Sequence, residues 1–89
     1  MAKRRNKLEV TRDILEVLKK NKKVGITNLI YRANLSTGSI KPHLEELIKN
    51  RLIKKDSEGG RTFFSICKKG LEFLEEFEKM RIFSEAYGL

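Results

Sequence analysis

Two stretches of this sequence repeat apolar residues with the period of an α-helix, and this repeat constrains the fold more than any other feature. The first set is Val10, Ile14, Val17 and Leu18, and the second set is Ile40, Leu44, Leu47 and Ile48. In each set the spacing i, i+4, i+7, i+8 places the side chains on one helical face. A shorter inward group, Leu29, Ile30 and Ala33, predicts a further helix between them. The chain must therefore pack three narrow apolar faces against one another.

Start and stop residues give the expected bounds of the first two helices. We expect the first helix at 7–21, because Asn21 and the lysines after it are typical of a helix C-terminus. We expect the second helix to be capped by Thr27 and to run through Asn34. The second helix therefore has barely two turns.

The third helix reaches about Arg51, but the sequence leaves two starting points open because Pro42 lacks a backbone donor. If Ser39 is the N-cap, Pro42 falls in the first turn, where a missing donor costs little. If Ser36 is the N-cap, the helix must be distorted where Pro42 lies. We favour Ser36, by a small margin.

The second half of the chain changes from helical spacing to short β-prone runs. The runs 52–55 and 62–66 flank a polar segment with Gly59-Gly60, where glycine supplies positive φ angles, and this pattern predicts a two-stranded hairpin. Val24 to Ile26 is a short extended segment. A last helical pattern runs from residue 68 to about Tyr87.

The last helical pattern carries more apolar residues than one face needs. We expect Leu71 and Leu74 to face the domain. The remaining large side chains form a separate stripe, at steps of three and four residues: Phe73, Phe77, Met80, Phe83 and Tyr87. Such a stripe would be a liability if it stayed in water, so we interpret it as a contact with a second copy of the chain.

Composition narrows the function. The 89 residues form one domain, and 20 Lys and Arg against 12 Asp and Glu give a net charge of +8, which favours a polyanionic partner. One Cys and one His exclude a Cys/His zinc site and an internal disulfide, so apolar packing must hold the fold. No catalytic constellation, membrane span or signal peptide is present, so we expect a cytoplasmic protein, not an enzyme, without metal, cofactor or small-molecule substrate.

The positive charge is concentrated in the first part of the chain. Residues 1–23 carry a net charge of +6, residues 24–67 carry +3, and residues 68–89 carry −1. A C-terminal segment that is rich in Phe and Leu and has no net positive charge suits a protein surface better than phosphate. Composition therefore predicts two functions, nucleic-acid binding in the first part and protein contact in the last.

The order of the elements is that of a winged helix-turn-helix, and three segments resemble a known family. Residues 30–36 (IYRANLS), 44–53 (LEELIKNRLI) and 68–74 (KKGLEFL) are similar to small archaeal winged-helix DNA-binding proteins, which are chromatin proteins or transcription regulators. The resemblance implies that the last helix pairs antiparallel with its copy in a second subunit. The sequence departs from the family at Cys67, where a Thr cap is commoner, and at Gly38 and Pro42 in the presumed reading helix.

These observations give a fold class that is mainly α-helical with a small β-hairpin. We expect a flexible basic arm at 1–6, a winged helix-turn-helix domain at 7–67, and a C-terminal dimerisation helix at 68–89 that forms an antiparallel contact. In such a domain the third helix enters the major groove of DNA.

The candidate DNA-binding residues lie on four parts of the chain. The reading helix supplies outward polar residues in its first turns, the hairpin supplies cations near its tip, the second helix supplies one arginine, and the arm supplies sequence-independent phosphate contacts. They are Thr37, Ser39, Lys41 and His43, then Lys54, Lys55 and Arg61, then Arg32, and finally Lys3, Arg4 and Arg5. We interpret His43 as a solvent-facing residue and not as a metal ligand.

We therefore predict a homodimer that binds double-stranded DNA, acting as a nucleoid-associated organiser or as a transcription regulator. The base-reading set contains no arginine, which favours the organiser. The alternative is a winged-helix adaptor that docks onto other proteins in a transcription assembly. RNA binding is disfavoured because the aromatic residues cluster on the last helix instead of on a sheet.

Overall fold

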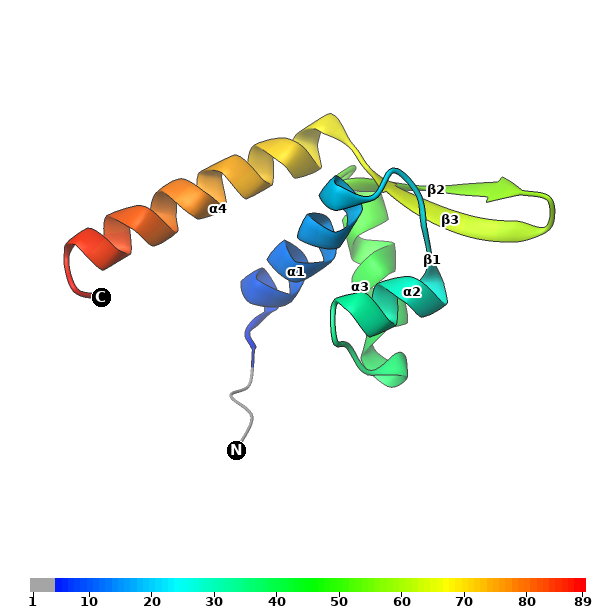
Figure 1. Ribbon diagram of the computed structural model, residues 1–89, viewed down its shortest axis with the longest axis horizontal. Coiled ribbons are helices and arrows are strands. Elements are labelled where there is room, and N and C mark those ends of the chain that lie inside the picture. Colours follow the sequence, from blue (N-terminus) through cyan, green and yellow to red (C-terminus); the bar gives the residue numbers. More distant parts are fainter. Residues whose placement is uncertain (1–4) are drawn as a thin grey trace.

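The computed structural model describes residues 5–89, and it contains four helices and a three-stranded sheet (Figure 1). The helices are α1 (Lys7–Lys20), α2 (Ile26–Arg32), α3 (Thr37–Lys49) and α4 (Lys68–Ala86). The strands are β1 (Val24–Gly25), β2 (Ile53–Glu58) and β3 (Arg61–Ile66). The predicted winged helix-turn-helix with a C-terminal helix is confirmed, and the wing is the β2–β3 hairpin.

α1 begins where the sequence predicts, because a capping box defines its start. The Asn6 side chain accepts a hydrogen bond from the Glu9 backbone N–H (2.8 Å), and the Asn6 backbone N–H donates to the Glu9 carboxylate (3.0 Å). This reciprocal pair satisfies donors that the first helical turn leaves free. Asn21 ends the helix in an extended conformation.

The Thr27 cap is wrong. Val24 and Gly25 pair with Phe64 and Phe63 of β3, so the chain passes directly from a strand into α2. Gly25 is therefore the N-cap residue, and Thr27 lies within the helix with its side chain exposed.

α3 begins at Thr37 with Ser36 as N-cap, as favoured from the sequence, and Pro42 lies inside the helix. Pro42 has no N–H to donate to the Gly38 carbonyl one turn earlier. Asn34, with a φ of 54°, makes the left-handed turn between α2 and α3. After this turn α3 lies at an angle to α2 (Figure 1).

The sheet has the order β1-β3-β2 and is antiparallel throughout. The two-stranded hairpin expected from the sequence thus gains β1 as a third strand on its inner edge. In the β2–β3 register Lys55 lies opposite Phe64 and Lys54 lies opposite Ser65. Because side chains alternate between faces along a strand, Lys54 and Lys55 lie on opposite faces of the wing. Phe64 is buried, so Lys55 is on the face toward the domain.

One apolar core joins all of these elements. Its buried members come from the three domain helices, the three strands and α4: Ile14, Leu15, Leu18, Val24, Leu29, Ala33, Ile40, Leu44, Leu47, Ile53, Phe64 and Leu74. Both periodic sets contribute as predicted, although Val10, Val17 and Ile48 lie at the margin of the core and are only partly buried.

α4 leaves the core after its first two turns and extends away from the domain (Figure 1). Leu74 is buried as predicted, but Leu71 is 41% exposed, so its predicted place against the domain is wrong. Gly70 takes that place. A Cβ at residue 70 would collide with the Leu52 carbonyl oxygen and lie 2.7 Å from Cγ1 of Ile66, so only glycine lets the helix approach this closely.

Candidate nucleic-acid interface

The helical spacing of α3 gives it a buried face, an opposite exposed face and two flanks between them. Ile40, Leu44 and Leu47 are buried and hold the helix on the core. The opposite face, at positions i, i+4 and i+7, carries Gly38, Pro42 and Glu45, and all three are exposed. The face that points away from the domain therefore has no side chain at residue 38, an apolar ring at Pro42 and a carboxylate at Glu45.

Three of the four residues predicted to read DNA are exposed, but they are divided between the flanks of α3. Thr37 and Lys41 lie on the side toward the wing, and Ser39 lies on the side toward α1. Gly38 and Pro42, which the sequence marks as departures from the family pattern, lie between these flanks. Once the start of α3 is known, their spacing of four residues predicts that both lie on the exposed face of the helix.

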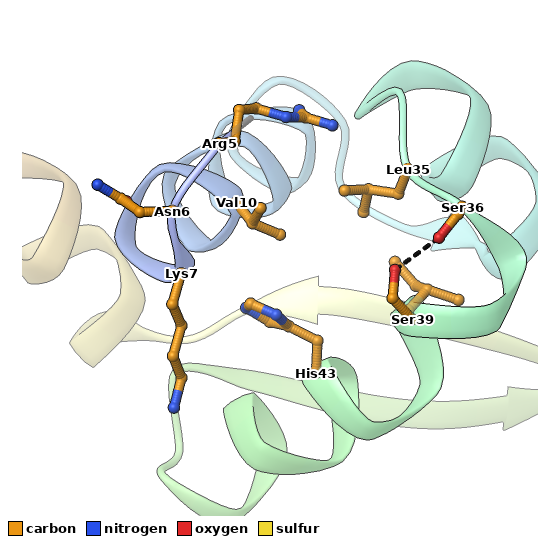
Figure 2. A pocket seen from close by; sticks show the side chains of 9 residues that line it. Arg5, Asn6, Lys7, Val10, Leu35, Ser36, Ser39 and His43 are labelled. Atoms are coloured by element: carbon orange, nitrogen blue, oxygen red, sulfur yellow. Dashed lines mark hydrogen bonds between the residues drawn. The ribbon is translucent and has the colours of Figure 1, made fainter. Parts of the chain in front are cut away.

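His43 does not face solvent, so that prediction is wrong. Its ring is half-buried between α3 and α1 (Figure 2). Nε2 lies 3.0 Å from Oγ1 of Thr11, a residue only 5% exposed. Burial lowers the pKa of His43 below its ordinary value, Lys7 lowers this pKa further, and the carboxylate of Glu46 acts in the opposite direction. Thr11 and His43 form a polar contact between α1 and the reading helix.

A cavity of about 550 Å³ separates the start of α1 from the start of α3. Figure 2 shows the Lys7 side chain at one edge, the His43 ring in the middle and the hydroxyls of Ser36 and Ser39, 2.7 Å apart, on the far side. Lys7 forms an ion pair with Glu46, and this contact holds the pKa of the Glu46 carboxyl below its usual range. Because Lys7 is already paired, the charge of this cavity is largely balanced.

The wing cations predicted to act together lie on different faces. Lys55 lines a cleft of about 230 Å³ between α3 and the sheet, together with Lys41 and Glu45 of α3. Lys54 and Arg61 lie on the outer face, where Arg61 is opposite Glu58. Glu58 also forms an ion pair with Lys23 and raises the pKa of that lysine. Only Lys55, of the three wing cations, shares a surface with α3.

Arg5 is held by the folded domain, although the sequence placed it in a flexible arm. Its guanidinium donates to the Asp13 carboxylate (2.6 Å), to the Ala33 carbonyl (2.8 Å) and to the Asn34 carbonyl. These bonds tie the start of α1 to the turn before α3. Arg32 lies beside α1, where it lines a hollow with Asp13. Lys3 and Arg4 lie outside the described residues.

The sequence around the helix-turn-helix contains no acidic residue from position 17 to position 44. The exposed cations of this stretch are the lysines at 19, 20, 22, 23 and 41 together with Arg32. Carboxylates return at Glu45 and Glu46 in the second half of α3. A polyanion would therefore meet the least repulsion at α2 and the first half of α3.

The predicted aromatic stripe of α4 is only partly free. Phe73 packs against the core, and Phe77 is half-buried beneath the guanidinium of Arg12, 5.3 Å from its ring centroid. Beyond the domain, Met80, Phe83 and Tyr87 are exposed.

The start of α1 continues this apolar surface, which sequence reasoning missed. Leu8 is exposed and lines a groove of about 470 Å³ with Phe77, Met80 and Phe83. Its position opposite α4 is visible only once the two helices are placed side by side in space.

Two further properties concern residues 5–89. No helix in this part of the chain combines the length and the apolar composition needed to cross a bilayer. The same residues contain no cluster of three or more His, Cys, Asp or Glu side chains placed to hold a metal ion.

Solved structures share this fold. Sso10a-2, a DNA-binding protein from Sulfolobus solfataricus, is 27% identical, with a TM-score of 0.78 over 93% of this chain and 86% of the other. The MarR family transcriptional regulator Sco5413 from Streptomyces coelicolor is 19% identical, with a TM-score of 0.74 over 84% of this chain. This chain covers 54% of that regulator. No curated protein matches the sequence.

A family comparison extends over nearly the whole chain. Residues 4–85 match the family described as winged helix-turn-helix, in agreement with the element order, the wing and the α2–α3 turn. The chain belongs to the winged helix-turn-helix family.

Proposed function

We propose that this protein binds double-stranded DNA, with the first half of α3 in the major groove and the wing on the phosphate backbone. One observation carries the proposal: Lys41 of α3 and Lys55 of β2 line the same cleft, with Glu45 at its border, next to residues 17–44, which contain no acidic residue. An α-helix fits the major groove, and cations on its flank can bind the adjoining strand. Lys3 and Arg4 would add phosphate contacts near the start of the domain.

The shape of α3 favours broad binding over a single target sequence. Gly38 and Pro42 have no hydrogen-bonding side chain, and Glu45 is repelled by phosphate. α3 contains no arginine, asparagine or glutamine, so in its first half Lys41 is the side chain able to bind a guanine edge. We therefore propose that the protein organises DNA in the nucleoid more than it marks one operator. A footprint on genomic DNA tests this, because broad protection supports the organiser and one protected operator contradicts it.

We also propose that the protein is a homodimer formed through α4. Met80 is 68% exposed and, with Phe83, Tyr87 and Leu8, belongs to an apolar surface that nothing in the described part of the chain covers. α4 carries more acidic than basic residues, so a second copy suits it better than DNA.

The dimer is tested by a matched pair of substitutions on α4. Met80→Glu places a charge in the groove and should give a folded monomer in analytical ultracentrifugation, whereas Ile82→Glu, on the opposite side of the helix, should leave the dimer intact. Met80 does not pack on the core, so its substitution leaves the domain stable. A dimer that survives Met80→Glu would place the contact elsewhere.

DNA binding itself is tested by fluorescence anisotropy with a random-sequence duplex at several salt concentrations. Binding that weakens steeply with salt and is displaced by unlabelled duplex supports the proposal. The alternative function, a docking module in a transcription assembly, predicts no duplex binding at 50–200 mM salt by an intact dimer.

A further inference from the structure

α2 exposes two hydroxyl-bearing side chains on one face. Thr27 and Tyr31 are one helical turn apart, and both are exposed, whereas Leu29 and Ala33 point into the core. Tyr31 is 85% exposed, so its ring makes little contact with its own domain. Packing therefore gives no reason for an aromatic residue at this position.

This face begins next to the surface assigned to DNA. Ile26, the neighbour of Thr27, lines the same cleft as Lys41 and Lys55. α2 and the turn after it contain no carboxylate, since the nearest acidic positions are 16 and 45. A phosphate that approaches the outward side of α2 would meet hydroxyl donors and no carboxylate of α2, while Glu45 of α3 lies at the neighbouring cleft.

We propose that Thr27 and Tyr31 form an uncharged backbone-binding surface, in which their hydroxyls donate hydrogen bonds to phosphate oxygens of the duplex. The inference rests on the proposed DNA-binding function. It agrees with the general geometry of the helix-turn-helix, in which the first helix of the motif crosses the backbone while the second lies in the groove. Serine, threonine and tyrosine hydroxyls are common phosphate donors in such interfaces.

The proposed surface has a physical signature that separates it from the lysines. A neutral donor releases no condensed counterion, so its loss lowers affinity without changing how affinity depends on salt. Loss of a lysine contact lowers affinity and also makes the salt dependence less steep. The two kinds of contact can therefore be told apart in one titration series.

The experiment measures duplex affinity from 50 to 200 mM salt for wild type, Thr27→Val, Tyr31→Phe and the double variant. Each change removes one hydroxyl and keeps the shape of the side chain. Tyr87→Phe is the matched control, because it makes the same chemical change on an exposed tyrosine of α4. We expect roughly fivefold weaker binding for each single variant, an unchanged salt slope, an unchanged melting temperature, and wild-type binding for the control.

The possible outcomes are distinct. Wild-type affinity in both single variants and in the double variant overturns the inference while DNA binding itself stands. A slope that flattens in step with the lost affinity also overturns it, because the contact is then ionic. If wild type binds no duplex at all, the proposed function fails, and this inference fails with it.

Discussion

The most discriminating prediction concerns the two neighbouring wing lysines. Lys55 lies on the face of the wing that meets α3, and Lys54 lies on the opposite face with Ser65. We expect Lys55→Ala to remove one phosphate contact in each protomer and Lys54→Ala to remove none. Because both side chains are exposed and adjacent in sequence, the two variants have the same net charge and nearly the same stability.

The expected magnitude follows from counterion release. Each lost phosphate contact reduces the slope of log affinity against log salt by about 0.9, so a dimer that loses two contacts loses about 1.8. Over a fourfold change in salt, from 50 to 200 mM, this corresponds to about a twelvefold smaller loss of affinity for Lys55→Ala than for wild type. Fluorescence anisotropy of a labelled random duplex measures both slopes. Equal slopes for the two variants would refute the placement of DNA on the α3 side of the wing.

Two further predictions concern stability. Gly70→Ala should lower the free energy of unfolding by about 3 kcal/mol, because the new Cβ meets the Leu52 carbonyl. Gly38→Ala, with open space around it, should raise the free energy of unfolding by about 0.5 kcal/mol. Denaturant melts that shift both variants in the same direction would contradict this. The lowered pKa of His43 means that the folded state favours the neutral ring. The folded protein therefore keeps the full stability contributed by this group above about pH 6.5, the pKa in the unfolded state, and loses that stability as the pH falls below it. Melting temperatures between pH 7.5 and 5.5 should therefore fall more for wild type than for His43→Gln, and parallel curves would contradict the lowered pKa of His43.

The helices and their order could be predicted because their evidence is local. The spacing of Ile40, Leu44 and Leu47, the Ser36 cap and the Gly59-Gly60 tip each lie within a few residues of the element they define. Thr27 was misplaced because β1 forms only when β3, forty residues later, pairs with it. Propensity near Thr27 contains no information about that pairing.

The candidate site was less predictable, since it depends on contacts between distant parts of the chain. His43 is polar and lies near the start of a helix, so the sequence alone suggests exposure, yet Thr11 and the start of α1 cover it. Arg5 shows the same limit, because its carbonyl partners belong to the α2–α3 turn. The division of Lys54 from Lys55 was readable in principle from strand alternation, but only once the register with Phe64 was known.

The absence of a side chain at residue 70 has a consequence for how this architecture can vary. The direction in which α4 departs is fixed where main chain meets main chain, at Gly70 and the Leu52 carbonyl. If α4 forms the proposed dimer contact, substitutions on its exposed half can change which partner it binds without changing the angle between α4 and the domain. In such a dimer, the distance between the two DNA-binding domains would be set by the backbone contact at Gly70. Substitutions that leave this contact intact would not change that distance.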